Sequence, residues 1–92
     1  KKLPNGMSQK TYDAASEALK AEEAYLKGEI SADEVYAKID SIYDLLSTFT
    51  FDDVNEQTQN DLVTFGLSVF NLGVLAGSDV TDSYDTLKDL LD

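Results

Sequence analysis

Four residue types are absent from this chain of 92 residues, which contains no cysteine, histidine, tryptophan or arginine. Without cysteine, the chain forms no disulfide and offers no thiolate to a metal ion. The absence of histidine also removes the usual nucleophile–base pairs and the usual zinc ligands. Any catalysis would have to rest on Asp, Glu, Lys, Ser, Thr or Tyr. We therefore predict a protein that is not an enzyme, with no catalytic residue, no bound metal and no cofactor.

Positive charge is scarce. Seven lysines stand against eighteen acidic residues, which gives a formal net charge of −11. Recognition of phosphate requires clustered Lys and Arg, and the only adjacent cationic pair is Lys1–Lys2 at one end of the chain. We therefore expect neither nucleic-acid binding nor adsorption to anionic lipid. A charge of −11 favours solubility through mutual repulsion, and the alternative is that it serves a basic partner.

A long hydrophobic run is also missing. The longest stretch without a charged residue covers positions 62–78, and its seventeen residues include three glycines, two serines and an asparagine. A helix that spans a membrane needs ~20 predominantly apolar residues. We therefore predict a helix of the protein core and no membrane span.

The first residue is Lys1 rather than methionine, so we expect a processed or trimmed chain. A composition without cysteine fits a reducing compartment, and it equally fits proteins that Gram-positive bacteria export. We favour an extracellular or cell-surface location in a Gram-positive bacterium over the cytoplasm.

Clear start signals indicate helices in the first half of the chain. Ser8 is a candidate N-cap between Met7 and Tyr12, which have the spacing of a hydrophobic staple, and Gly28 is a candidate left-handed C-cap. Residues 31–34 read Ser-Ala-Asp-Glu, which is a capping box. Apolar residues then recur at steps of four and three, as on one face of a helix.

The second half repeats these signals. Thr50 and Asp53 form a second capping box, and we expect the helix that it begins to cover residues 51–76 before Gly77 ends it. A last helix is expected from about position 79 or 82 to position 91.

These segments predict an all-α fold, namely a small antiparallel helical bundle of three long helices plus a shorter C-terminal helix. Short links make helices that follow one another antiparallel neighbours, and nothing in the sequence has the pattern of a strand. We expect a single domain over residues 1–92, with residues 1–7 frayed and the third helix most buried.

The expected third helix has an unusual distribution of side chains. At about 100° per residue, Thr64, Ser68 and Asn71 fall on a narrow polar stripe. The other side carries two apolar ridges with three glycines between them. One ridge consists of Phe65, Val69, Leu72 and Ala76, the other of Val63, Leu67, Phe70 and Val74, and the glycines are Gly66, Gly73 and Gly77.

Three glycines on one line predict a groove that another backbone approaches, because each glycine in a helix costs about 0.5–1 kcal/mol relative to alanine. We expect the other helices of the same chain to fill the groove and to cover both ridges. The alternative is that part of it stays open for a twin subunit or a partner helix. The candidate contact site then consists of Gly66, Gly73, Gly77, Phe65 and Phe70.

Acidic residues give two further candidates. Glu22 lies between Leu19 and Leu26 within an apolar stripe. We expect its carboxylate to reach water at the edge of the stripe, and the alternative is a buried carboxyl with a raised pKa. Four aspartates near the C-terminal end lack the spacing of a helix-flanked calcium loop, so we expect a solvated helix face. They are Asp79, Asp82, Asp85 and Asp89.

One segment, residues 12–46, contains SEALKAEEAYL, a short link, and then SADEVYAKIDSIYDLL. It resembles the FIVAR-type helical modules of Gram-positive surface proteins, in which an alanine- and leucine-rich helix precedes a link with Ser or Thr and an acid-acid-Val start. The resemblance implies an exported, wall-associated module that binds host or cell-surface ligands. The segment after Thr50 does not follow the family pattern, and no binding residue is carried over.

The sequence therefore predicts a non-catalytic interaction or structural module, bacterial and exported or at the cell surface, whose ligand it does not name. The alternative is a small acidic inhibitor or immunity-type protein that masks a basic protein partner. A protein partner or a homodimer is compatible with these predictions.

Overall fold

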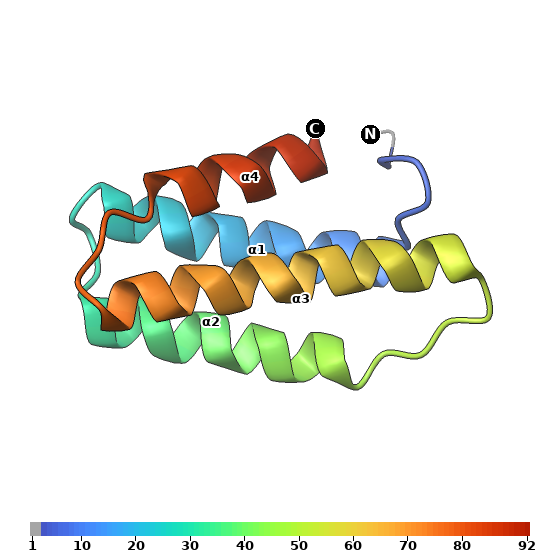
Figure 1. Cartoon of the computed structure of the whole chain (residues 1–92), viewed down its shortest axis with the longest axis horizontal. Coiled ribbons are helices and arrows are strands. Elements are labelled where there is room, and N and C mark those ends of the chain that lie inside the picture. The colour runs from blue at the N-terminus through green and yellow to red at the C-terminus, as the bar shows by residue number, and fades with distance from the viewer. Residues whose placement is uncertain (1–2) are drawn as a thin grey trace.

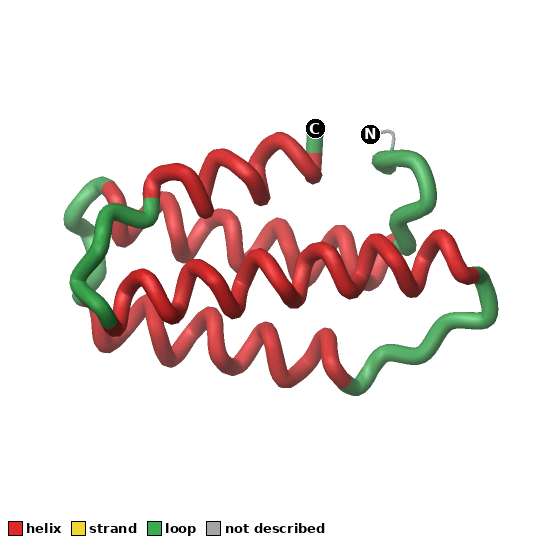
Figure 2. Tube along the Cα trace, viewed as in Figure 1, coloured by secondary structure: helices red, strands yellow, loops and turns green. Residues whose placement is uncertain are grey.

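The computed structural model describes residues 3–92, which form four helices joined by short links (Figures 1 and 2). The helices are α1 (Gln9–Leu26), α2 (Ala32–Ser47), α3 (Val54–Leu75) and α4 (Thr81–Leu91). The predicted all-helical class, with three long helices and a shorter one at the C-terminal end, is confirmed.

The helices α1 and α3 each contact both α2 and α4, whereas α2 and α4 do not contact each other. The α1–α2 and α3–α4 links lie at one end of the bundle and the α2–α3 link lies at the other (Figure 1). The helix α3 therefore lies between α2 and α4, which it contacts on opposite sides (Figure 1).

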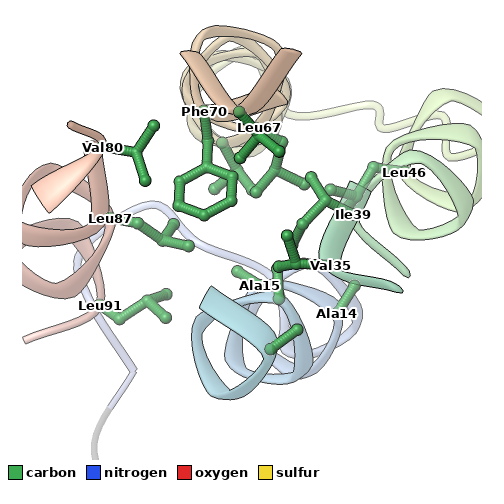
Figure 3. Close-up of a cluster of buried hydrophobic side chains, with 14 of the residues drawn as sticks. Ala14, Ala15, Val35, Ile39, Leu46, Leu67, Phe70, Val80, Leu87 and Leu91 are labelled. Atoms are coloured by element: carbon green, nitrogen blue, oxygen red, sulfur yellow. The ribbon is translucent and has the colours of Figure 1, made fainter. Parts of the chain in front are cut away.

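The core fills the space where the four helices meet (Figure 3). Its fully enclosed apolar side chains are Ala15 and Ala18 of α1, Val35, Ile39 and Leu46 of α2, and Val63, Leu67 and Phe70 of α3. Leu87 and Leu91 of α4 complete it, together with Val80 from the preceding link. Small alanines on α1 opposite large side chains on α2 and α3 let the helices interdigitate closely.

The predicted caps of the first two helices are confirmed. The Ser8 hydroxyl caps α1, and Ser31 and Glu34 exchange the two hydrogen bonds of a capping box at 3.0 and 3.1 Å. Gly28 follows the end of α1 with a φ of +77°. The next N–H donates to the Ala24 carbonyl at 2.8 Å, which is the bond of a Schellman motif.

The predicted capping box at Thr50 is wrong, because the N-cap of α3 is Asp53. Phe51 therefore lies in the link rather than in the helix. It packs edge to face against Phe49, with ring centroids 6.2 Å apart, and the Lys10 ammonium lies 4.7 Å from its centroid. These aromatic and cation–π contacts hold the link against α1, and α3 begins three residues later than predicted.

The predicted fraying of residues 1–7 is wrong for the part that the structure describes. Met7 is 5 % exposed, and its N–H donates to the Pro4 carbonyl at 3.1 Å. Gly6 has a φ of +82° and lies against Asn55, where an added Cβ would come within 3.3 Å of the Asn55 Cβ. Residues 3–7 thus form a packed turn, and Lys1 and Lys2 lie outside the described residues.

Two buried asparagines fix the rotation of α3 about its axis. The Asn60 amide donates to the Leu46 carbonyl at 3.2 Å and accepts from the Thr11 hydroxyl at 3.0 Å. The Asn71 amide donates to the Tyr36 carbonyl at 3.3 Å. The Asn71 Oδ1 atom itself has no partner. Because leaving these buried amide N–H groups unpaired as well would be costly, the bonds favour the observed rotation of α3 together with its buried apolar ridge.

Candidate protein-interaction groove on α3 and α4

The two apolar ridges of α3 have opposite environments. The buried ridge consists of Val63, Leu67, Phe70 and Val74, which are between 0 and 7 % exposed. On the other ridge, Phe65, Val69 and Leu72 are 70, 40 and 64 % exposed. The prediction that the chain covers both ridges is therefore wrong. The prediction that α3 is the most buried helix is also wrong, because six of its 22 residues are buried, against six of 18 in α1. The Cα trace measures 16 Å in its shortest dimension, and packed helix axes are 8–10 Å apart. The bundle is therefore only two helices thick in that direction, and the other three helices cannot enclose α3 on all sides.

The exposed ridge extends by one more residue, Leu62, towards the start of α3 and has a regular spacing. Its members, which we call the outer seam, are Leu62, Phe65, Val69, Leu72 and Ala76. They recur at alternating steps of three and four, which is the spacing of the a and d positions of a heptad repeat. This spacing is typical of a helix that packs along a second helix, and within residues 3–92 no other helix covers the outer seam.

The outer seam borders an open groove between α3 and α4, with a volume of about 600 Å³. The lining residues are Leu62, Phe65, Gly66 and Val69 of α3, and Ser83, Thr86, Asp89 and Leu90 of α4. Phe65 and Gly66 were predicted from the sequence, whereas the α4 wall was not. Apolar periodicity does not mark that wall, because Ser83 and Thr86 are polar and only Leu90 is apolar.

The three predicted groove glycines have three different environments. A Cβ at Gly66 would meet nothing within 4 Å, so this glycine leaves the groove open. A Cβ at Gly73 would lie 2.5 Å from the Cγ1 atom of Val80, so the same chain fills the groove there. Gly77 lies beyond the end of α3 with a φ of +68°, where it terminates the helix and lines no groove. Phe70, the other candidate, belongs to the core.

Alanine substitutions at the first two glycines are expected to change stability in opposite directions. Gly66→Ala should raise the free energy of unfolding by about 0.5–1 kcal/mol, because alanine favours the helix and meets no neighbour. Gly73→Ala should lower it by about 1–3 kcal/mol, because the new methyl group must displace Val80. Urea unfolding of the two variants measures both changes, and a shift of the same sign in both would contradict the assignment.

The predicted polar stripe of α3 faces α2 and the adjoining solvent. Thr64 and Ser68 are partly exposed, whereas Asn71 is buried and tied to α2. A smaller hollow of about 260 Å³ lies here. Its lining residues are Tyr36, Asp40 and Tyr43 of α2, and Leu67, Ser68, Asn71, Leu72 and Leu75 of α3. Asn71 therefore helps to dock α2, Ser68 lines the hollow beside it, and neither residue lines the α3–α4 groove.

Exposed acidic residues border the outer seam on both sides. Asp89 lines the groove, Asp82 lies two turns earlier on the same face of α4, and Asp61 lies at the opposite edge of the seam on α3. We call these three residues the acidic rim. None of them takes part in the ion pairs found among the described residues. Lys88, although adjacent to Asp89 in sequence, is not among the residues that line the groove.

Glu22 lies in the core rather than at its edge, so the expectation that its carboxylate reaches water is wrong. The residue is 1 % exposed, its Oε1 atom has no hydrogen-bond partner, and burial raises the pKa of Glu22 to about 8. The helix α4 packs against α1, and this packing encloses the stripe that carries Glu22. Since it lines neither the groove nor the smaller hollow, we interpret it as a cost to stability.

Comparisons with protein-family models, with curated proteins and with solved structures find no match for this chain. The resemblance of residues 12–46 to FIVAR-type modules therefore stays a prediction. Across residues 3–92, no helix is long and apolar enough to cross a membrane. The same residues contain no group of three or more acidic side chains placed to share a metal ion.

Proposed function

We propose that this chain is a non-catalytic protein-interaction module that binds its partner through the outer seam and the groove beside it. The observation that carries the proposal is the exposure of large apolar side chains with helix-packing spacing, above all Phe65 at 70 % and Leu72 at 64 %. On a soluble domain, a contiguous exposed apolar patch of this kind marks an interaction site.

The proposal includes a bacterial origin and an exported or cell-surface location, which the absence of cysteine and the resemblance of residues 12–46 support. It also includes the antiparallel arrangement of helices that the short links favour. In such a bundle, the Asn60 and Asn71 amides hold α3 in one orientation, so the outer seam is presented by a rigid scaffold.

A second candidate function is a small acidic inhibitor or immunity-type protein that masks a basic partner. The acidic rim favours it, because Asp89 lines the apolar groove, Asp61 and Asp82 lie beside the outer seam and on the same face of α4 as Asp89, and none of the three takes part in the ion pairs of residues 3–92. Both functions use the same surface. They differ in their effect on the partner, because an inhibitor abolishes the activity of the protein that it binds.

A comparison of two variants in affinity capture tests the proposed function. Phe65→Ser combined with Leu72→Ser removes the centre of the seam, and Leu45→Ser, at a position 50 % exposed on α2, is a control for the loss of an exposed leucine elsewhere. We expect the wild type and the control to retain the same partner protein from a native lysate. The amount retained should fall on the order of tenfold with the seam variant, because central apolar contacts dominate the binding energy of interfaces. Quantitative mass spectrometry measures retention, and equal retention by all three chains would contradict the proposal.

A further inference from the structure

We infer that the α3–α4 groove binds an amphipathic helix whose apolar stripe is flanked by Lys or Arg residues and which comes from another protein. The inference rests on the proposed function and specifies the chemistry of the partner. Three observations carry it: the spacing of the outer seam, the open space over Gly66, and the charge of the rim.

The seam has the geometry of one half of a helix pair. From Leu62 to Ala76 it covers fourteen steps, or about 21 Å at 1.5 Å per residue. A helix with apolar side chains at i, i+3, i+4 and i+7 makes contacts with this period. A partner helix lying along the seam would place side chains between Phe65 on one wall and Leu90 on the other, over Gly66, where nothing lies within 4 Å of an added Cβ.

The charges around the groove favour a basic partner. Asp89 lines it on α4, Asp82 lies two turns earlier on the same face of that helix, and Asp61 borders the seam on α3. No lysine is among its lining residues, and the whole chain has a net charge of −11 without a single arginine. A helix with cations on both sides of its apolar stripe would place them opposite these carboxylates. Complementary charges of this kind speed association and select the partner.

A second copy of this chain fits the groove poorly. An interface formed by two seams would bring two acidic rims together, and no lysine is among the residues that line the groove of either copy. Like charges placed against each other across an interface oppose association. The charge distribution therefore favours a basic helix over self-association.

Titration with two synthetic helical peptides tests the inference. Both have three heptads with leucine at a and d, and they carry either lysine or glutamate at the remaining positions. We expect the lysine peptide to shift the backbone amide signals of Leu62, Gly66, Val69, Thr86 and Leu90 in nitrogen-15 NMR spectra of the full chain. Its Kd should rise at least fivefold between 50 and 300 mM NaCl, because salt screens exposed charges. The glutamate peptide should leave these signals unchanged.

Two variants with the same change in net charge show whether the rim itself contributes. Asp82→Asn combined with Asp89→Asn should raise the Kd for the lysine peptide about three- to tenfold, as expected for two exposed ion pairs. Asp13→Asn combined with Asp44→Asn alters the outer faces of α1 and α2 and should change the Kd less than twofold. Equal effects of the two pairs would overturn the role of the rim.

The remaining outcomes separate failure of this inference from failure of the proposed function. Equal binding of both peptides in the groove would overturn the basic partner but support a docking surface. A dimer in sedimentation equilibrium whose formation shifts the seam signals would show that the occupant is a second copy. Absence of binding by either peptide, together with a monomer, would overturn the inference, while seam-dependent capture of a partner could still support the proposed function.

Discussion

Replacing Glu22 with glutamine is expected to raise the free energy of unfolding by about 3 kcal/mol at pH 7. Burial raises the pKa of Glu22 to about 8 in the folded chain, from 4.5 for the exposed group. Each pKa unit corresponds to about 1.4 kcal/mol, and pH 7 lies about 2.5 units above the unfolded value. Glutamine is neutral and nearly isosteric, so it removes the cost of keeping a proton on a buried carboxyl.

The pH dependence of this stabilisation is specific. Between pH 4.5 and pH 8 the unfolded chain has released the Glu22 proton and the folded chain still holds it, so the stability of the wild type falls as the pH rises. Below pH 4.5 the carboxyl is neutral in both states and the advantage of glutamine should vanish. Hydrogen bonding from Tyr84 lowers the pKa of Glu23, which raises stability only as the pH rises through the acidic range up to about 4.5, and this contribution cancels between wild type and variant.

Urea unfolding of wild type and Glu22→Gln at pH 4, 6, 7 and 8 measures this difference. Glu17→Gln makes the same change in charge at an exposed position of α1 and should stay within about 0.5 kcal/mol of the wild type. A constant difference between Glu22→Gln and the wild type across this pH range would contradict the buried position of the carboxyl.

Phe70→Ala and Phe65→Ala are expected to differ by several kcal/mol, although they make the same change on the same helix. Phe70 is fully buried and packs edge to face against Tyr25, with ring centroids 6.2 Å apart. Its truncation should lower the free energy of unfolding by about 3–5 kcal/mol, because it loses buried area and leaves a cavity. Phe65 is 70 % exposed, and its truncation should cost no more than about 0.5 kcal/mol.

Chemical denaturation of both variants checks this contrast. It separates the face of α3 that builds the core from the face that is free to bind. Similar losses in the two variants would show that the outer seam is covered, and the proposed function would then lose its main support.

Features that depend on a few neighbouring residues could be predicted from the sequence. The caps at Ser8 and Ser31 and the stop at Gly28 each involve atoms within about one helical turn, so their residue types suffice. The start of α3 could not be decided in this way, because Thr50 and Asp53 are both good caps three residues apart. The contact of Lys10 with Phe51 favours Asp53, and that contact joins distant parts of the chain.

The candidate site shows the same limit more clearly. The spacing of apolar residues predicted two ridges on α3. That spacing does not show which ridge other helices cover and which one faces solvent. Which ridge is buried depends on where α1, α2 and α4 lie, and on the Asn60 and Asn71 amides that fix the rotation of α3. The burial of Glu22 likewise depends on α4 packing against α1, which no local pattern encodes.

The central claim is that the outer seam of α3 binds a partner helix, and one calorimetric titration tests it most directly. The lysine peptide is titrated into the wild type and into the variant that combines Phe65→Ser with Leu72→Ser, after thermal unfolding has shown equal stability. We predict that the Kd rises on the order of tenfold or more in the variant. An unchanged Kd would contradict the claim, because binding would then not use the seam.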